Sequence, residues 1–370
     1  MKRQAVVTLL VLVLAAGLAV YAWATRPAGD QAAETDPELV IWDAGEHQVR
    51  EIVIEREGEQ IVLRPGPPPE LVASPDMPFG GQGPMAAEQI GGLLSPDRWW
   101  IHRPRPVPVA SEYASTLVEN LRRLEAERVI AEAAADPAEY GLDRPSARIT
   151  VRFAGSGEAR VLELGGDSPL TGGGAYARVA NGQKVWTVSS ELADTLRMSI
   201  DELRELMFVP FADERVRVVE IRWGEERLAF QREETGTSWT MQRNGRDAGK
   251  QDSGRLSELW FALHQWRAGE VVSDRAGGAA EQGRYGLDEP FGEIRLRFGS
   301  TGKGAPELVV RVGKKTAAGG RYVTTNEGPW VYALDPDDLQ YFEEQVLPPL
   351  REPAAGQDGA GAGGDGGQER

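Results

Sequence analysis

The stretch Tyr140-Gly141-Leu142-Asp143-Arg144-Pro145 decides the fold, because it returns later in the chain as Tyr285-Gly286-Leu287-Asp288-Glu289-Pro290. The two copies of this hexapeptide motif lie 145 residues apart and share five of six residues. A motif that repeats at a long, fixed spacing is typical of a duplicated structural unit. The chain of 370 residues is long enough for two such units, each with its own hydrophobic core.

The residues around each motif predict β-strands. Residues 148–153 and 293–298 alternate apolar and polar side chains, as half-buried strands do. Further upstream, residues 51–63 and 216–230 each predict a hairpin, with Gly58 and Gly224 at the turns. Such short connections favour antiparallel pairing, because parallel strands need crossovers of about a dozen residues or more.

Amphipathic helices complete each predicted unit. The positions expected to face a sheet are Tyr113, Leu117, Leu121 and Leu124 in the first copy and Leu256, Leu259, Leu263 and Trp266 in the second. A closing helix is predicted at residues 190–206 and again at 336–346, the second beginning with Asp335 as its N-cap. The sequence therefore predicts an α+β fold of two tandem related domains, antiparallel sheets with packed helices, at residues 39–206 and 207–352.

The N-terminal residues predict a membrane anchor at 1–25 and a polar tether at 26–38. Residues 5–24 are apolar except for Thr8, and a helix of this length crosses the hydrocarbon core of a bilayer. Lys2 and Arg3 precede it, which places the N-terminus in the cytoplasm. We expect a single-pass inner-membrane protein whose bulk is periplasmic. A cleaved signal peptide remains the alternative, because Ala22-Trp23-Ala24 has the spacing of a cleavage site.

The hexapeptide motif itself is interpreted as structural. Its glycine permits positive φ, its leucine can anchor in the core, and its proline forces the preceding residue out of helical conformation. Asp143 and Asp288 are one carboxylate per domain, without the paired partner of glycosidase chemistry. The positions given this structural role are Tyr140, Gly141, Leu142, Asp143, Pro145, Tyr285, Gly286, Leu287, Asp288 and Pro290.

Composition argues against several kinds of chemistry. The chain has no cysteine and only three histidines, which leaves few nucleophiles, general bases or metal ligands. Its net charge of −16 argues against binding of nucleic acid. Gly313-Lys314-Lys315-Thr316 lacks the spacing of a phosphate-binding loop, because Leu308 stands where that motif needs glycine. We therefore predict no catalytic, cofactor-binding or metal-binding residues.

The first copy carries an insertion of Pro-rich and Gly-rich sequence at residues 65–92. It predicts an extended surface loop or, alternatively, a docking segment. The chain ends in a Gly-rich and Ala-rich tail at 353–370, which predicts disorder. Aromatic side chains that could anchor a partner from exposed positions are Trp100, Trp223 and Phe79.

The two motifs, with the strand pairs that follow them, resemble the family called domain of unknown function 4340 (DUF4340), in tandem copies. The resemblance implies a bacterial, membrane-anchored protein, often encoded near components of gliding-motility-type ABC transporters. It implies no catalytic residues.

Two functional hypotheses follow from these observations. The first is a non-enzymatic, membrane-tethered extracytoplasmic scaffold or accessory subunit that binds a membrane protein complex. The second is a periplasmic ligand-binding module that holds a peptide, glycan or cation in a cleft between the repeats. An enzyme would require convergent acidic residues, which the sequence does not display.

Overall fold

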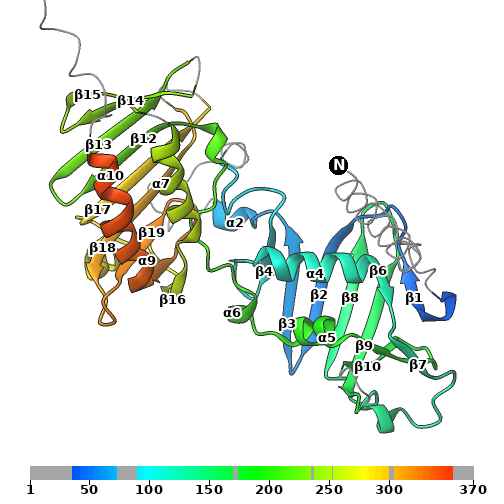
Figure 1. Cartoon of the computed structure of the whole chain (residues 1–370). Helices are drawn as coiled ribbons and strands as arrows, with labels where there is room; N and C mark the ends of the chain where they lie inside the picture. Colours follow the sequence, from blue (N-terminus) through cyan, green and yellow to red (C-terminus); the bar gives the residue numbers. More distant parts are fainter. Residues whose placement is uncertain are drawn as a thin grey trace, which may run out of the picture.

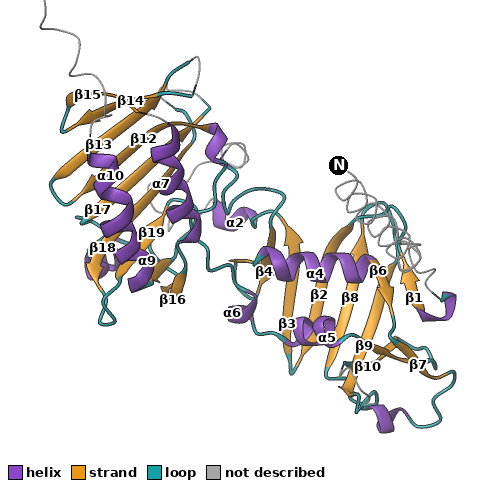
Figure 2. Cartoon of the chain, viewed as in Figure 1, coloured by secondary structure: helices purple, strands orange, loops and turns teal. Residues whose placement is uncertain are grey.

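The structure is a computed structural model that describes residues 36–72, 90–169, 174–234, 237–251, 253–299 and 304–352. It contains two nine-stranded antiparallel sheets, each with helices packed against one face (Figures 1 and 2). Every strand of the first sheet comes from residues 39–206, and every strand of the second from residues 207–352. We call the parts of the chain that carry these sheets the first unit and the second unit.

The first sheet has the strand order β5-β4-β3-β2-β8-β9-β10-β11-β7. Helices α4 (Ser111–Arg122) and α5 (Ser190–Arg197) lie across one face of it, and the short helix α6 (Ile200–Leu203) follows (Figure 1). A small pair, β1 (Val40–Asp43) with β6 (Arg123–Glu125), flanks the sheet. The strands are β2 (Val49–Arg56), β3 (Glu59–Pro65), β4 (Trp99–Arg103), β5 (Val107–Pro108), β7 (Arg128–Ala131), β8 (Ala147–Phe153), β9 (Ala159–Asp167), β10 (Ala175–Val179) and β11 (Val185–Val188).

The second sheet has the order β15-β14-β13-β12-β17-β18-β19-β20-β16, which is the same plan element by element. Its covering helices are α7 (Ser253–Gln265), α9 (Pro336–Tyr341) and α10 (Leu347–Arg351), with a π-helical turn between the last two (Figure 2). The strands are β12 (Val216–Trp223), β13 (Glu226–Arg232), β14 (Trp239–Arg243), β15 (Arg246–Gln251), β16 (Ala268–Ser273), β17 (Gly292–Phe298), β18 (Glu307–Lys315), β19 (Arg321–Thr325) and β20 (Val331–Leu334).

The predicted α+β architecture of antiparallel sheets and packed helices is confirmed. Alternation along β8 and β17 buries one row of side chains under the helices, for example Ile149 and Ile294, and leaves the charged row on the other face. The helices contribute Leu117 and Leu121 to the first core and Leu256 and Leu259 to the second. Both predicted hairpins form, and Gly58 and Gly224 have positive φ at their turns.

Three local predictions differ from the structure. The closing helix of the first unit is two helices rather than one, because Ser199 and Glu202 form a capping box that starts α6. Leu124 is buried as expected but lies in strand β6, after α4 has ended at Arg122. The second closing helix begins at the Asp335 cap as predicted and continues through a π-helical turn to Arg351.

Several predictions concern residues outside the described ranges. These are the membrane helix at residues 5–24, the tether up to residue 35, Phe79 and the tail at 353–370. Within the described ranges, no helix combines the length and the apolar character needed to span a bilayer.

Candidate functional site

The hexapeptide motif fixes a turn against the neighbouring strand in both units. Gly141 and Gly286 each have φ of 68°, and the leucine that follows each glycine is buried. The carbonyl oxygen of Tyr140 lies against Gly165 of β9, and that of Tyr285 lies against Gly313 of β18, so closely that a Cβ on either glycine would be 2.2 Å away. The motif therefore forms a turn that packs against a neighbouring strand in both units.

A methyl group at either strand glycine is expected to destabilise the protein. Gly165→Ala and Gly313→Ala would each force the motif's backbone to move, at a cost of about 1–3 kcal/mol in the free energy of unfolding. Chemical denaturation measures this change. The matched controls are Gly157→Ala and Gly278→Ala, where a Cβ would meet no atom within 4 Å and the change should stay within about 0.5 kcal/mol. Equal losses in both pairs would contradict the structural role.

An arginine ties each motif to an ion pair on the polar face of its sheet. In the first unit, Arg178 donates to the Leu142 carbonyl at 3.1 Å and to Glu163 at 2.6 Å. In the second, Arg311 donates to the Leu287 carbonyl at 3.5 Å and to Glu293 at 2.9 Å. The two units thus use the same type of contact, although the arginine comes from β10 in one and β18 in the other.

The polarity of one cross-strand ion pair is reversed between the units. Arg148 of β8 faces Glu163 of β9 at 2.8 Å, whereas Glu293 of β17 faces Arg311 of β18. Burial alone would raise the pKa of Glu293, but hydrogen bonds and charges from Arg295 and Arg311 outweigh it and lower the pKa. Both units have the ion pair, but its carboxylate lies on β9 in the first unit and on β17 in the second. This favours a role in strand pairing over chemistry that needs a carboxylate at one fixed place.

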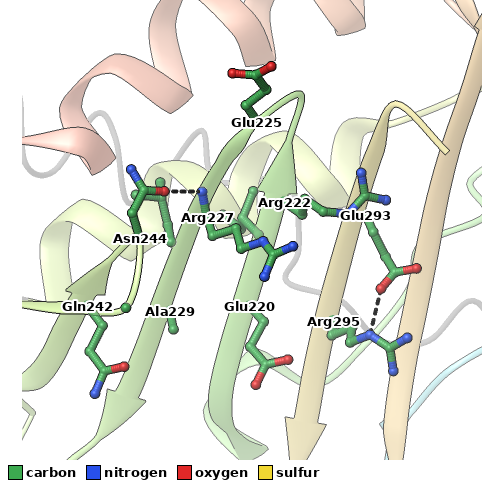
Figure 3. A pocket seen from close by; sticks show the side chains of 12 residues that line it. Glu220, Arg222, Glu225, Arg227, Ala229, Gln242, Asn244, Glu293 and Arg295 are labelled. Carbon is green, nitrogen blue, oxygen red and sulfur yellow. Dashed lines mark hydrogen bonds and ion pairs between the residues drawn. The ribbon is translucent and has the colours of Figure 1, made fainter. Parts of the chain in front are cut away.

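The polar face of the second sheet forms a broad concavity of about 700 Å³ (Figure 3). Figure 3 shows side chains from β12, β13, β14 and β17 standing on this face, with the Arg227 N–H donating to Asn244 at 2.9 Å. The first sheet has a smaller concavity of about 320 Å³. In it, Glu51 forms ion pairs with both Arg64 and Arg152. The residues that line the larger one include Glu220, Arg222, Glu225, Arg227, Gln242, Asn244, Glu293 and Arg295.

Both polar faces carry acidic side chains beside arginines. Acids on these faces lie between arginines: Glu163 pairs with Arg148 and Arg178, and Glu293 pairs with Arg295 and Arg311. Among the described residues, no group of three or more histidine, aspartate or glutamate side chains could hold a metal ion. The arrangement can supply hydrogen bonds and complementary charge to a partner.

Apolar side chains of the first unit are buried in the core of the second. Trp100 of β4 packs on Trp330, with the ring centroids 5.8 Å apart. The described ends of the insertion join it, because Leu71 and Ile90 are buried in the same cluster, followed by Leu93 and Leu94. The surface-loop prediction is therefore wrong for these ends, which pack against the second unit, and the docking segment stays a prediction.

Polar contacts reinforce the junction between the units. Asp274 accepts from Arg204 at 2.7 Å and from Arg105 at 2.6 Å, and Arg105 also reaches Asp201. Beside these ion pairs lies a cavity of about 270 Å³ lined from both units, by Arg98, Tyr113 and Glu205 on one side and by His264 and Arg267 on the other. The His264 ring stacks on Phe211 at 4.3 Å, and its burial lowers its pKa.

Glu327 is the buried acid of this junction, and its side chain is fully enclosed. One carboxyl oxygen, Oε2, accepts from the backbone N–H of Leu93 at 2.8 Å, while Oε1 has no hydrogen-bond partner among the described residues. Burial raises its pKa to about 7, against the opposing effect of the Leu93 and Leu94 N–H groups and the charge of Arg98. The sequence analysis missed Glu327, because Asn326-Glu327-Gly328 between two strands has the composition of an exposed turn.

The predicted exposure of Trp100 and Trp223 is wrong. Trp100 is 0% exposed because the second unit covers it. Trp223 is 7% exposed, since its ring packs on Phe342 and its Nε1 donates to Glu343 at 3.1 Å. Neither side chain is available to an external partner in this structure. Large apolar side chains that are exposed include Met207, Phe261, Phe291 and Tyr341.

Comparison with known proteins gives one family match. The model of the domain of unknown function DUF4340 matches residues 99–252, from β4 of the first sheet to the end of β15 in the second. No curated protein and no solved structure matches the chain. The matched residues include strands of both sheets. The chain therefore contains one DUF4340 domain, at residues 99–252.

Proposed function

We propose that this protein is a non-enzymatic, membrane-tethered extracytoplasmic scaffold or accessory subunit that binds a membrane protein complex. The observation that carries the proposal is the pair of sheets with one plan, each covered by helices on one face and presenting ion-paired polar side chains on the other. We also propose that both units are DUF4340-like repeats. The shared strand order and the two motifs support this.

The polar faces favour a protein partner for a physical reason. Charged groups that are already paired lose little when a complementary surface approaches, and they select partners through electrostatic complementarity. The net charge of −16 favours a partner with basic patches. The family resemblance suggests gliding-motility-type ABC transporter components as that partner, and the apolar residues 5–24 supply the proposed anchor in the same membrane.

Site-specific photo-crosslinking in intact cells tests this proposal. A benzophenone amino acid at Gln242, exposed on the polar face of the second sheet, is expected to capture a subunit of a membrane complex, which mass spectrometry identifies. The matched control is Gln265, exposed at the end of α7 on the helical side. Capture from Gln265 alone would contradict the assignment of the polar face. Absence of any membrane subunit from both positions would contradict the scaffold.

A ligand-binding module is the second candidate. The cavity of about 270 Å³ at the junction favours it, because residues from both units line the space. If a peptide, glycan or cation binds there, a thermal-shift screen of the full-length protein should find a solute that raises the melting temperature. The same solute should lose its effect with Arg267→Ala, whose side chain lines the cavity from the second unit. A screen without any stabilising solute would count against this candidate.

A further inference from the structure

We propose that the junction between the two units is a pH-operated latch, in which segment 90–98 of the first unit stays closed over Glu327 while that side chain is neutral and separates from the second unit when it ionises. Glu327 is 1% exposed and lies across the junction from this segment. The contact is close, since a Cβ at Gly92 would overlap the Glu327 carboxyl group. Any hydration of the carboxylate therefore requires segment 90–98 to move.

Burial disfavours the ionised form of the carboxyl group. The backbone N–H groups of Leu93 and Leu94 favour the carboxylate but do not outweigh its burial, and Oε1 has no hydrogen-bond partner among the described residues. A buried carboxylate with an unsatisfied oxygen carries a desolvation penalty that solvent would remove. Its burial accordingly raises the pKa of Glu327 to about 7.

The surrounding charges leave Glu327 without a counterion of its own. Arg98 exerts an attraction on the carboxylate, but Arg98 also lies 3.5 Å from Glu205. Arg204 and Arg105 are held by Asp274 and Asp201. Three arginines therefore already face three acids, and an ionised Glu327 adds a fourth negative charge.

Arg267, Tyr113, Glu112 and Glu202 also line the junction cavity. Two side chains with shifted pKa values, Tyr332 and His264, lie at the junction too. Burial raises the pKa of Tyr332, so its hydroxyl stays neutral and supplies no positive charge. Burial lowers the pKa of His264, so the imidazole is neutral at the pH where Glu327 ionises. Neither group opposes the charge that develops at Glu327.

Opening would change what the molecule presents to a partner. The side chains of Leu93 and Leu94 are buried against the second unit and would become accessible when the segment leaves. The angle between the two polar sheet faces would also be released. In this way the latch couples the proton concentration to the arrangement of the two units.

Distance measurements between the units test the latch. The chain has no cysteine, so Glu119→Cys in α4 and Ser257→Cys in α7, both exposed, accept spin labels specifically. Pulsed electron–electron double resonance measures the distance between the two labels in the full-length protein. It is expected to give one narrow distance distribution at about pH 5 and a broader or shifted one at about pH 9. The midpoint of the change should fall between pH 5 and pH 7, because the hydrated carboxyl group of the open form titrates near its ordinary pKa of 4.5 and the buried one near 7. An identical distribution at both pH values would overturn the proposal.

Three variants assign the change to Glu327. Glu327→Gln keeps an oxygen acceptor for the Leu93 N–H but cannot ionise, so its distribution should stay narrow at both pH values. Arg98→Gln should move the midpoint to lower pH, because loss of the Arg98 charge raises the pKa of Glu327 in the closed state and makes its ionised form open the junction more readily. His264→Gln should leave the midpoint where it is. A full pH response in Glu327→Gln, a midpoint raised in Arg98→Gln, or a response lost in His264→Gln would each overturn the latch.

Discussion

Alanine in place of Trp100 is expected to lower the free energy of unfolding by about 3–5 kcal/mol, the range for a large aromatic removed from a packed core. Trp100 is 0% exposed and fills the boundary between the units against Trp330. Its removal leaves a cavity that neither unit can close by itself, because the surrounding residues belong to both. Guanidinium denaturation followed by circular dichroism measures the loss.

The control for this prediction is Phe261→Ala, a substitution of similar size at a side chain that is 56% exposed. It should cost no more than about 1 kcal/mol. A double-mutant cycle with Trp330→Ala should show a coupling energy of about 0.5–1.5 kcal/mol, as direct contact of the two rings requires. If Trp100→Ala costs no more than Phe261→Ala, Trp100 does not pack between the two units.

Stability should fall by about 3 kcal/mol between pH 4.5 and pH 7 because of Glu327, as follows from a pKa raised from 4.5 to about 7. Below pH 4.5 the carboxyl group is protonated in both the folded and the unfolded chain, so it adds no pH dependence. Within the window the unfolded chain releases the proton while the folded chain retains it, and stability decreases as pH rises. Above pH 7 the loss is complete.

The pH dependence of unfolding in wild type and in Glu327→Gln isolates this contribution. The variant has no proton to lose at this position, so the difference in unfolding free energy between the two proteins should change across the window and be constant outside it. Other carboxyl groups cancel, including Glu51 and Glu293. The pKa values of both are lowered because arginine contacts outweigh the effect of burial, so their contributions are lost at lower pH. A difference that is flat from pH 4.5 to pH 7 would contradict the burial of Glu327.

Failure of these two stability predictions can be distinguished from failure of the proposed function. If neither the Trp100 nor the Glu327 prediction is met, the junction and the latch are both contradicted. The proposal that the polar faces bind a partner, which crosslinking tests, would not be affected. Conversely, failure of the crosslinking experiment would leave the stability predictions untouched, because those depend only on packing and burial between the units.

The sequence by itself determined the local structure of this protein. Alternation of apolar and charged residues set the strands and the face each side chain occupies, as at Ile149 and Arg148 of β8. Glycine at positions 58 and 224 set the hairpin turns, and Asp335 set the start of a helix. These features depend on backbone conformation and on neighbours a few residues away, which a repeated pattern records directly.

Only the tertiary structure decided what covers each face. Alternation correctly separates Trp99 from Trp100, but it cannot show that the second unit lies over Trp100 and hides it from solvent. Glu327 has the sequence of a turn, yet segment 90–98, more than 200 residues earlier in the chain, encloses it. Burial, and with it a raised pKa, arises from contacts between distant segments, and no local pattern encodes those contacts.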